Sequence, residues 1–293
     1  MAWFIILAVI TAGLALGLPP DPHTLHELHI SGVAYRIAVL ALLIPYGVIW
    51  YAAFYAFSKL REYARTIQGF EDGKAFRSIT VGMGVLAFGL IVPTAVSLVM
   101  QSITGYHPGF RPVSAIVTNH LGILTAVVAF TYINNGTHVL IRLGKNRPGL
   151  ADIRLFALLF ITLATVFTYL VTNYHLQNNG YYLNTPLLIT TLIIPSLFAW
   201  LVALLGAYEI WLYAKTAKGV LYRQALRRFS YGIVAAIAGS VASQFVANTF
   251  VAGEVHHSIE ALLLVDYAFL AVIALGLILM ALGTRKLQKI EEV

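Results

Sequence analysis

The chain has 293 residues, of which 59% are hydrophobic and 11% charged, and its mean hydropathy is +0.82. A soluble domain carries about a quarter charged residues, so this composition excludes an ordinary soluble domain and favours a membrane protein. The net charge of +7 does not indicate nucleic-acid binding, because the basic residues lie in short loops and the tail, and the absence of cysteine excludes disulfides, thiolate metal sites and cysteine nucleophiles.

Eight apolar segments are predicted to cross the membrane, at residues 3–18, 31–58, 78–102, 113–141, 154–174, 185–213, 229–252 and 260–283. The expected fold class is therefore an all-α integral membrane protein with about eight transmembrane helices. The first segment could instead be a signal peptide, since Pro19 and Pro20 follow it. It has no basic region before it, so we expect a retained helix.

The basic residues predict the orientation. Of the 19 Lys and Arg residues, all but Arg36 and Arg111 lie in the loops 59–77, 142–154 and 215–228 or in the tail 285–289. The positive-inside rule then places these loops and both termini in the cytoplasm and the chain in the plasma (inner) membrane. The opposite, outer loops are nearly free of Lys and Arg.

The second half of the chain repeats the first. A gapless shift of 150 residues aligns YARTIQG (63–69) with YAKTAKG (213–219) and KAFRSITVG (74–82) with QALRRFSYG (224–232). After a slip of three residues, NNGTHVLIRL (134–143) parallels ALGTRKLQKI (281–290). We therefore predict two parallel four-helix units related by a pseudo-twofold axis along the membrane normal. The units are residues 1–150 and residues 151–293.

Two prolines and two tryptophans also fall in register, Pro45 with Pro195 and Trp50 with Trp200. Each proline removes a helix hydrogen bond, so we expect equivalent kinks and matching tryptophan environments. A cavity between these two helices is a candidate ligand site, with simple packing as the alternative.

Charges well inside the predicted spans are few. Arg36 and Asp266 both lie near the outer surface, and a salt bridge between them would offset their desolvation. Alternatively, Arg36 reaches the interface and Asp266 lies in a wet vestibule. Lys59 and Glu209 are equivalent in the repeat, and we expect both at the cytoplasmic interface.

Histidine has a one-sided distribution, since only His138 lies toward the cytoplasm. Imidazole ligates haem iron, Zn and Cu and titrates near neutral pH, so the outer histidines are candidates for a haem or transition-metal site or for pH sensing. The alternative is that outer loops poor in Lys and Arg simply use His. We expect at least two of the outer histidines to converge. They are His23, His26, His29, His107, His120, His175, His256 and His257.

A 4+4 parallel repeat with outer-face histidines resembles the plan of the haem A synthases. That resemblance implies haem ligation by histidines at the outer ends of even-numbered helices, for which His29, His120 and His257 are the nearest matches. The predicted sixth helix has no histidine within its span, and the family's glutamate-histidine-arginine signature is missing. The chain departs from the family on both points.

Three functions remain open from the sequence. The first is a membrane redox or metal-site protein that uses the outer histidines. The second is a small-solute or ion transporter with a cavity between the proline-containing helices. The third is a non-catalytic subunit or scaffold of a membrane assembly. The expected partners are the lipid bilayer and other membrane subunits or further copies of the chain, and no nucleic acid.

Overall fold

The computed structural model describes residues 2–18, 31–104, 111–145, 194–217, 219–252 and 259–289. Across these residues the chain is helical and contains no strand, which confirms the all-α class. The helices are α1 (Ala2–Gly17), α3 (Gly32–Thr66), α4 (Glu71–Gly89), α5 (Val92–Thr104), α6 (Arg111–Lys145), α9 (Ile194–Thr216), α10 (Val220–Ala252) and α11 (Ile259–Lys289). The predicted segment 154–174 and the start of the segment 185–213 lie outside the described residues.

Three of the described helices are long and apolar enough to cross a membrane, at Gly32–Thr66, Asp72–Val96 and Tyr267–Leu287. Exposed side chains support the same conclusion. On α11 a stripe of Leu275, Ile278 and Leu282 is exposed at helical spacing. Soluble proteins rarely leave such apolar surface uncovered, so the surface suits contact with lipid.

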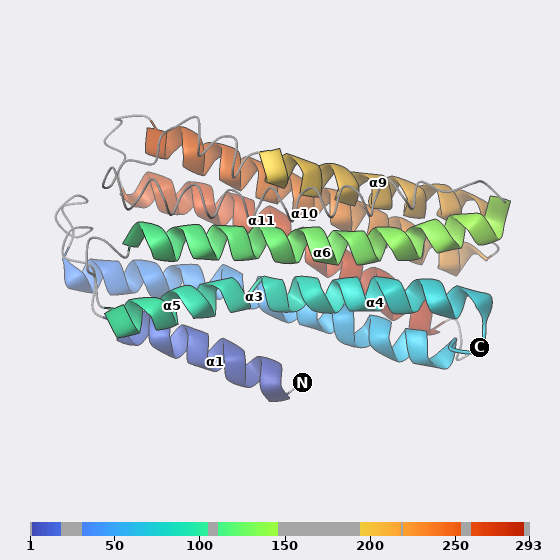
Figure 1. Ribbon diagram of the computed structural model, residues 1–293, viewed down its shortest axis with the longest axis horizontal. Helices are drawn as coiled ribbons and strands as arrows, with labels where there is room; N and C mark the ends of the chain where they lie inside the picture. Colours follow the sequence, from blue (N-terminus) through green and yellow to red (C-terminus); the bar gives the residue numbers. More distant parts are fainter. Residues whose placement is uncertain are drawn as a thin grey trace.

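The described helices run alongside one another in a bundle (Figure 1), and six of them close into a ring of packed neighbours. In chain order α3 packs against α4, α4 against α6, α6 against α9, α9 against α10, and α10 against α11. The ring closes because α11 returns to pack against α3. Helix α1 lies outside the ring against α3 and α5, and α5 also packs against α6. Helices α3 and α9 therefore lie on different sides of the ring, each between its own two neighbours.

Glycine allows α4 and α6 to approach closely. A Cβ atom built on Gly82 would lie 2.5 Å from the carbonyl oxygen of Ala129, and one on Gly136 would lie 2.5 Å from the carbonyl oxygen of Ala75. No real side chain tolerates such distances, so the two backbones are in direct contact at both points. Small residues at helix contacts are a main source of packing energy in a membrane, where the hydrophobic effect is absent.

The contact between α10 and α11 has the same pattern. A Cβ on Gly232 would lie 2.5 Å from the carbonyl oxygen of Gly276, and one on Gly283 would lie 2.8 Å from that of Ala225. Gly232 is 150 residues after Gly82, and Gly283 is 147 residues after Gly136. The carbonyls that they approach follow the same two shifts. The two helix pairs thus make equivalent contacts at equivalent positions of the sequence repeat.

Two side chains donate to backbone carbonyls near prolines. Pro45 lies inside α3 and has no N–H for the carbonyl of Ala41, which instead accepts a hydrogen bond from the hydroxyl of Tyr267 on α11. Pro93 follows the break between α4 and α5, where the indole N–H of Trp50 donates to the carbonyl of Leu90 at 3.1 Å. The predicted segment 78–102 covers parts of both helices, and the candidate span Asp72–Val96 runs through this break in the helix ladder.

We predict that Gly82→Ala lowers the stability of the detergent-solubilised protein by about 1–3 kcal/mol, because the added methyl group forces α4 away from α6. The matched control is Gly47→Ala on α3, where a Cβ meets nothing within 4 Å. Alanine there should leave stability unchanged or raise it by about 0.5–1 kcal/mol. Thermal unfolding followed by circular dichroism measures both, and equal effects at the two positions would contradict the close contact.

Candidate functional site

Three polar side chains are buried on one face of α6. Asn134, Thr137 and His138 are 1%, 0% and 7% exposed, and their spacing of three and four residues places them on adjoining turns. Polar groups are costly in a membrane interior and occur there mostly for function or for pairing between helices. This face of α6 is therefore the first place to look for a site.

Glu209 of α9 meets this face. The hydroxyl of Thr137 has two acceptors within hydrogen-bond distance, the Oε2 atom of Glu209 at 2.8 Å and the carbonyl of Asn134 at 2.9 Å, and the Nδ1 atom of His138 lies 3.8 Å from the Oε1 atom of Glu209. The side chain of Glu209 is 12% exposed. One turn earlier Gly206 lies against Asn134, since a side chain there would reach the amide of Asn134. The result is a polar cluster of Asn134, Thr137, His138 and Glu209, called the α6–α9 cluster below.

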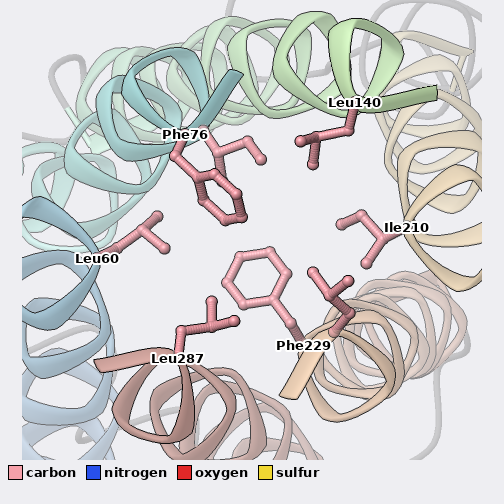
Figure 2. Close-up of a pocket in the computed structure, with 8 residues that line it drawn as sticks. Leu60, Phe76, Leu140, Ile210, Phe229 and Leu287 are labelled. Carbon is pink, nitrogen blue, oxygen red and sulfur yellow. The ribbon is translucent and has the colours of Figure 1, made fainter. Parts of the chain in front are cut away.

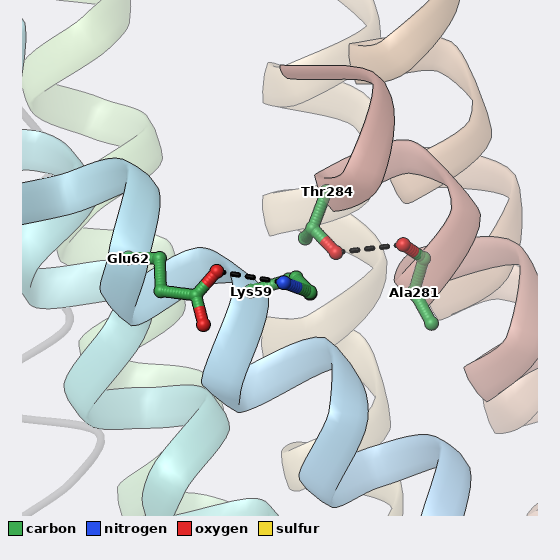
Figure 3. Close-up of polar contacts among 4 residues, drawn as sticks. All are labelled: Lys59, Glu62, Ala281 and Thr284. Carbon is green, nitrogen blue, oxygen red and sulfur yellow. Dashed lines mark hydrogen bonds and ion pairs between the residues drawn. The ribbon is translucent and has the colours of Figure 1, made fainter. Parts of the chain in front are cut away.

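The equivalent contact between α3 and α11 carries the opposite charge. The repeat places Lys59 at the position of Glu209, Thr284 at that of Thr137 and Arg285 at that of His138. Thr284 is fully buried and donates to the carbonyl of Ala281 at 2.7 Å, within its own helix. Lys59 reaches Glu62 at 2.7 Å, one turn further along α3 (Figure 3). The α6–α9 contact thus holds the carboxylate of Glu209 beside the imidazole of His138. The α3–α11 contact holds two basic side chains and the exposed carboxylate of Glu62.

Apolar core side chains of the ring helices meet inside the ring, and this group is called the constriction below. A cavity of about 10 Å³ lies there, which is about the smallest space that admits one water molecule. All six ring helices line it, and Figure 2 shows their side chains converging from around the ring. The lining residues are Leu60, Phe76, Ile79, Leu140, Ile210, Leu226, Phe229 and Leu287.

Every lining residue has its counterpart in the repeat. The shift of 150 relates Leu60 to Ile210, Phe76 to Leu226 and Ile79 to Phe229, and the shift of 147 relates Leu140 to Leu287. The constriction is thus built from four pairs of equivalent positions, each contributing one apolar side chain from each half of the chain. The site lies where the two halves meet.

Aromatic side chains lie beyond the constriction, toward the basic loops. The ring of Tyr63 packs edge-on against Phe76 with centroids 4.9 Å apart, and Tyr213 contacts Tyr222 in the same way at 6.3 Å. Burial raises the pKa of Tyr222 above its ordinary value, and nearby Tyr63, Tyr213 and Asp72 raise it further. The phenol therefore stays neutral at physiological pH. Neutral aromatic side chains therefore pack between the helices at this side of the ring.

A second cavity, of about 230 Å³, lies outside the ring between α1, α3 and α5. Its lining is mainly apolar, with the polar side chains of Thr11, Tyr35, Tyr46 and Thr94 among aliphatic ones. Trp50 also contributes to the lining. Neither cavity is the one that the sequence predicted between the two proline-containing helices, α3 and α9. The constriction takes one lining residue from each of those helices, and the second cavity is lined by α3 but not by α9.

The sequence-predicted site residues are only partly described. His23, His26, His29, His107, His175, His256 and His257 lie outside the described residues, and so do the side chains of His120, Asp266 and Pro195. Arg36 is exposed, Trp50 is buried, and Pro45 and Trp200 are partly buried. The convergence of histidines and the pair of Arg36 with Asp266 therefore stay predictions. Within the part of the chain that is described, no group of three His, Asp or Glu side chains could hold a metal ion.

Sequence reasoning missed the α6–α9 cluster. It placed Glu209 at the cytoplasmic interface because only four residues separate it from the predicted end of its span, whereas the side chain turns inward to α6. The signal available was the spacing of Asn134, Thr137 and His138 on one face of an otherwise apolar helix.

Comparisons with protein-family models, with curated proteins and with solved structures give no match.

We predict that Thr137→Val destabilises the protein by about 1–3 kcal/mol, because it removes the hydroxyl that donates to a largely buried carboxylate. Thr284→Val is the matched control, since Thr284 is equally buried and donates to the carbonyl of Ala281, as Thr137 can to the carbonyl of Asn134, but has no carboxylate acceptor. Its cost should be smaller. Unfolding in detergent measures both variants, and combining each with Glu209→Gln should show coupling for Thr137 alone. Equal costs without coupling would refute the interaction.

Proposed function

We propose that this chain is a membrane transporter for a small solute, formed by two parallel four-helix units around a shared axis. The units are residues 1–150 and 151–293, with eight transmembrane helices in all. The observation that carries the proposal is the constriction, to which all six ring helices contribute and in which every side chain has a counterpart in the other half. Transporters with parallel repeats bind and gate their substrates between the repeats.

The equivalent glycine contacts support the two-unit arrangement. Gly82 and Gly136 hold α4 against α6, and Gly232 and Gly283 hold α10 against α11, through the same partner positions. Each unit then has one close helix pair of its own. The contacts between units are α6 with α9 and α11 with α3. A rigid pair in each unit and two contacts between units suit a mechanism in which the units rock against each other.

The proposed topology follows the basic residues. The loops after α3, α6 and α9 carry most of the Lys and Arg, so the constriction and the aromatic groups beyond it lie toward the cytoplasm of a plasma (inner) membrane protein. In the described conformation this side of the axis is shut by apolar side chains. A solute would pass only after the two units move apart at the constriction.

We predict that the double variant Phe76→Ala, Phe229→Ala makes proteoliposomes leaky to erythritol and to K⁺, because it removes both aromatic rings from the constriction. Stopped-flow light scattering and a K⁺ electrode measure the two fluxes. Wild-type liposomes should stay tight to both probes. Tyr51→Ala, which removes an exposed ring from α3, is the matched control and should also stay tight.

Folding of the double variant must be checked first, because losing two core rings can cost several kcal/mol. A single symmetric peak in size-exclusion chromatography suffices. If the double variant folds and remains as tight as the control, there is no path along the axis and the transporter proposal fails. The haem or metal hypothesis on the outer histidines stays a separate prediction, which a visible absorption spectrum of the purified protein would address.

A further inference from the structure

We propose that Glu209 binds and releases a proton at the contact between α6 and α9, and that this proton is coupled to the movement of the two units. The proposal rests on the transport function proposed above and assigns its driving ion. It is carried by the position of the carboxyl group, by its two neighbours and by the difference between the two contacts that join the units.

Both oxygens of the carboxyl group face groups of α6. Oε2 accepts from the hydroxyl of Thr137 at 2.8 Å, and Oε1 faces the Nδ1 atom of His138 at 3.8 Å. Both side chains of the acid and imidazole pair are nearly buried, with 12% and 9% exposed. Uptake of one proton converts the carboxylate to a carboxylic acid and removes one negative charge from the contact. His138 is placed to hold a proton beside Glu209 in the alternative state.

The charged and titratable groups around Glu209 can be followed helix by helix. Helix α6 presents His138. Helix α10 also packs against α9, and there the neutral hydroxyl of Ser230 donates to the carbonyl of Ala207 on α9 at 2.7 Å. On α10 Arg227 is exposed, and the Cβ atom of Arg228 lies beside Gly283 of α11.

On α9 itself the charge that follows Glu209 is Lys215, whose ammonium group lies over the ring of Trp211 at 3.5 Å. Trp211 is two residues from Glu209, so it lies on another face of the helix. Glu209 pairs with His138, so a change in the charge of Glu209 acts on α6.

The neighbours favour a proton over a metal cation. A metal ion needs several oxygen or nitrogen ligands around it, whereas the contacts of the Glu209 carboxyl group are one hydroxyl, of Thr137, and one imidazole, of His138. The described residues contain no group of three His, Asp or Glu that could surround an ion. A carboxyl group between a hydroxyl donor and an imidazole is instead suited to proton exchange.

The other contact between the units cannot take the same role. There Lys59 and Arg285 keep their charges throughout the neutral pH range, and Glu62 is half exposed to solvent. At the α6–α9 contact a carboxyl group and an imidazole face each other instead, so transfer of a proton to or from this pair would change the charge of that contact. A neutral carboxylic acid is also much less costly to carry through an apolar region than a carboxylate. Protonation would thus favour a conformation in which this contact is drier.

The test is a pH titration of the reconstituted full-length protein by infrared difference spectroscopy. The chain has 12 Asp and Glu residues, so the band of Glu209 is identified in the difference between the wild-type and Glu209→Gln spectra. Wild type should show, as the pH falls, a carbonyl-stretch band of one protonated carboxyl group that Glu209→Gln lacks. Glu62→Gln, the matched control on α3, should keep the band. His138→Gln should keep it and shift its midpoint. Size-exclusion chromatography confirms that each variant is folded.

Two results would overturn the inference. One is a band that survives in folded Glu209→Gln. The other is a spectrum that responds to Na⁺ at constant pH in place of protons. The outcome is independent of the flux assay. If the band belongs to Glu209 but the Phe76→Ala, Phe229→Ala liposomes stay tight, the proton site stands and the transport function fails. If the liposomes leak but the band does not belong to Glu209, the path stands without this coupling.

Discussion

The arrangement depends on two close backbone contacts, between α4 and α6 and between α10 and α11. Glycine makes both possible, and in lipid such contacts replace the hydrophobic driving force that would assemble a soluble core. Once each pair is fixed, α3 and α9 can pack beside them, and the returning α11 closes the ring. The constriction follows from this closure, because six helices around one axis each direct an apolar side chain inward.

The contact between α6 and α9 and the contact between α11 and α3 differ in a way that the ring itself does not require. Helices α6 and α9 meet through Thr137, His138 and Glu209, whereas α11 and α3 carry Thr284, Arg285 and Lys59 at the equivalent positions. Conserving the threonine in both places keeps the local helix geometry alike. Its neighbours differ, so one contact has a carboxyl group beside an imidazole and the other has two basic side chains. A frame with equivalent helix contacts in this way carries a chemically one-sided site.

Much of the fold could be predicted from the sequence, because apolar length and glycine register are local signals. The helices lie where the apolar segments predicted them, although α3 runs on to Thr66, beyond the predicted end at residue 58, since the hydropathy pattern records only its apolar part. The break before Pro93 and the contact of the Glu209 side chain with α6 could not be predicted from the sequence, because both depend on neighbouring helices. The carbonyl of Leu90 is satisfied by Trp50, and Glu209 by Thr137, and each partner is distant in the chain.

Ring closure is the central claim, and disulfide or short-linker cross-linking in this cysteine-free chain tests it most directly. The pairs are Thr137→Cys with Glu209→Cys, across α6 and α9, and Ala41→Cys with Tyr267→Cys, across α3 and α11. Treated in membranes with a short bifunctional thiol reagent, both pairs should give intramolecular cross-links that mass spectrometry identifies. Cross-linking across α6 and α9 without any across α3 and α11 would show an open row of helices and contradict the account.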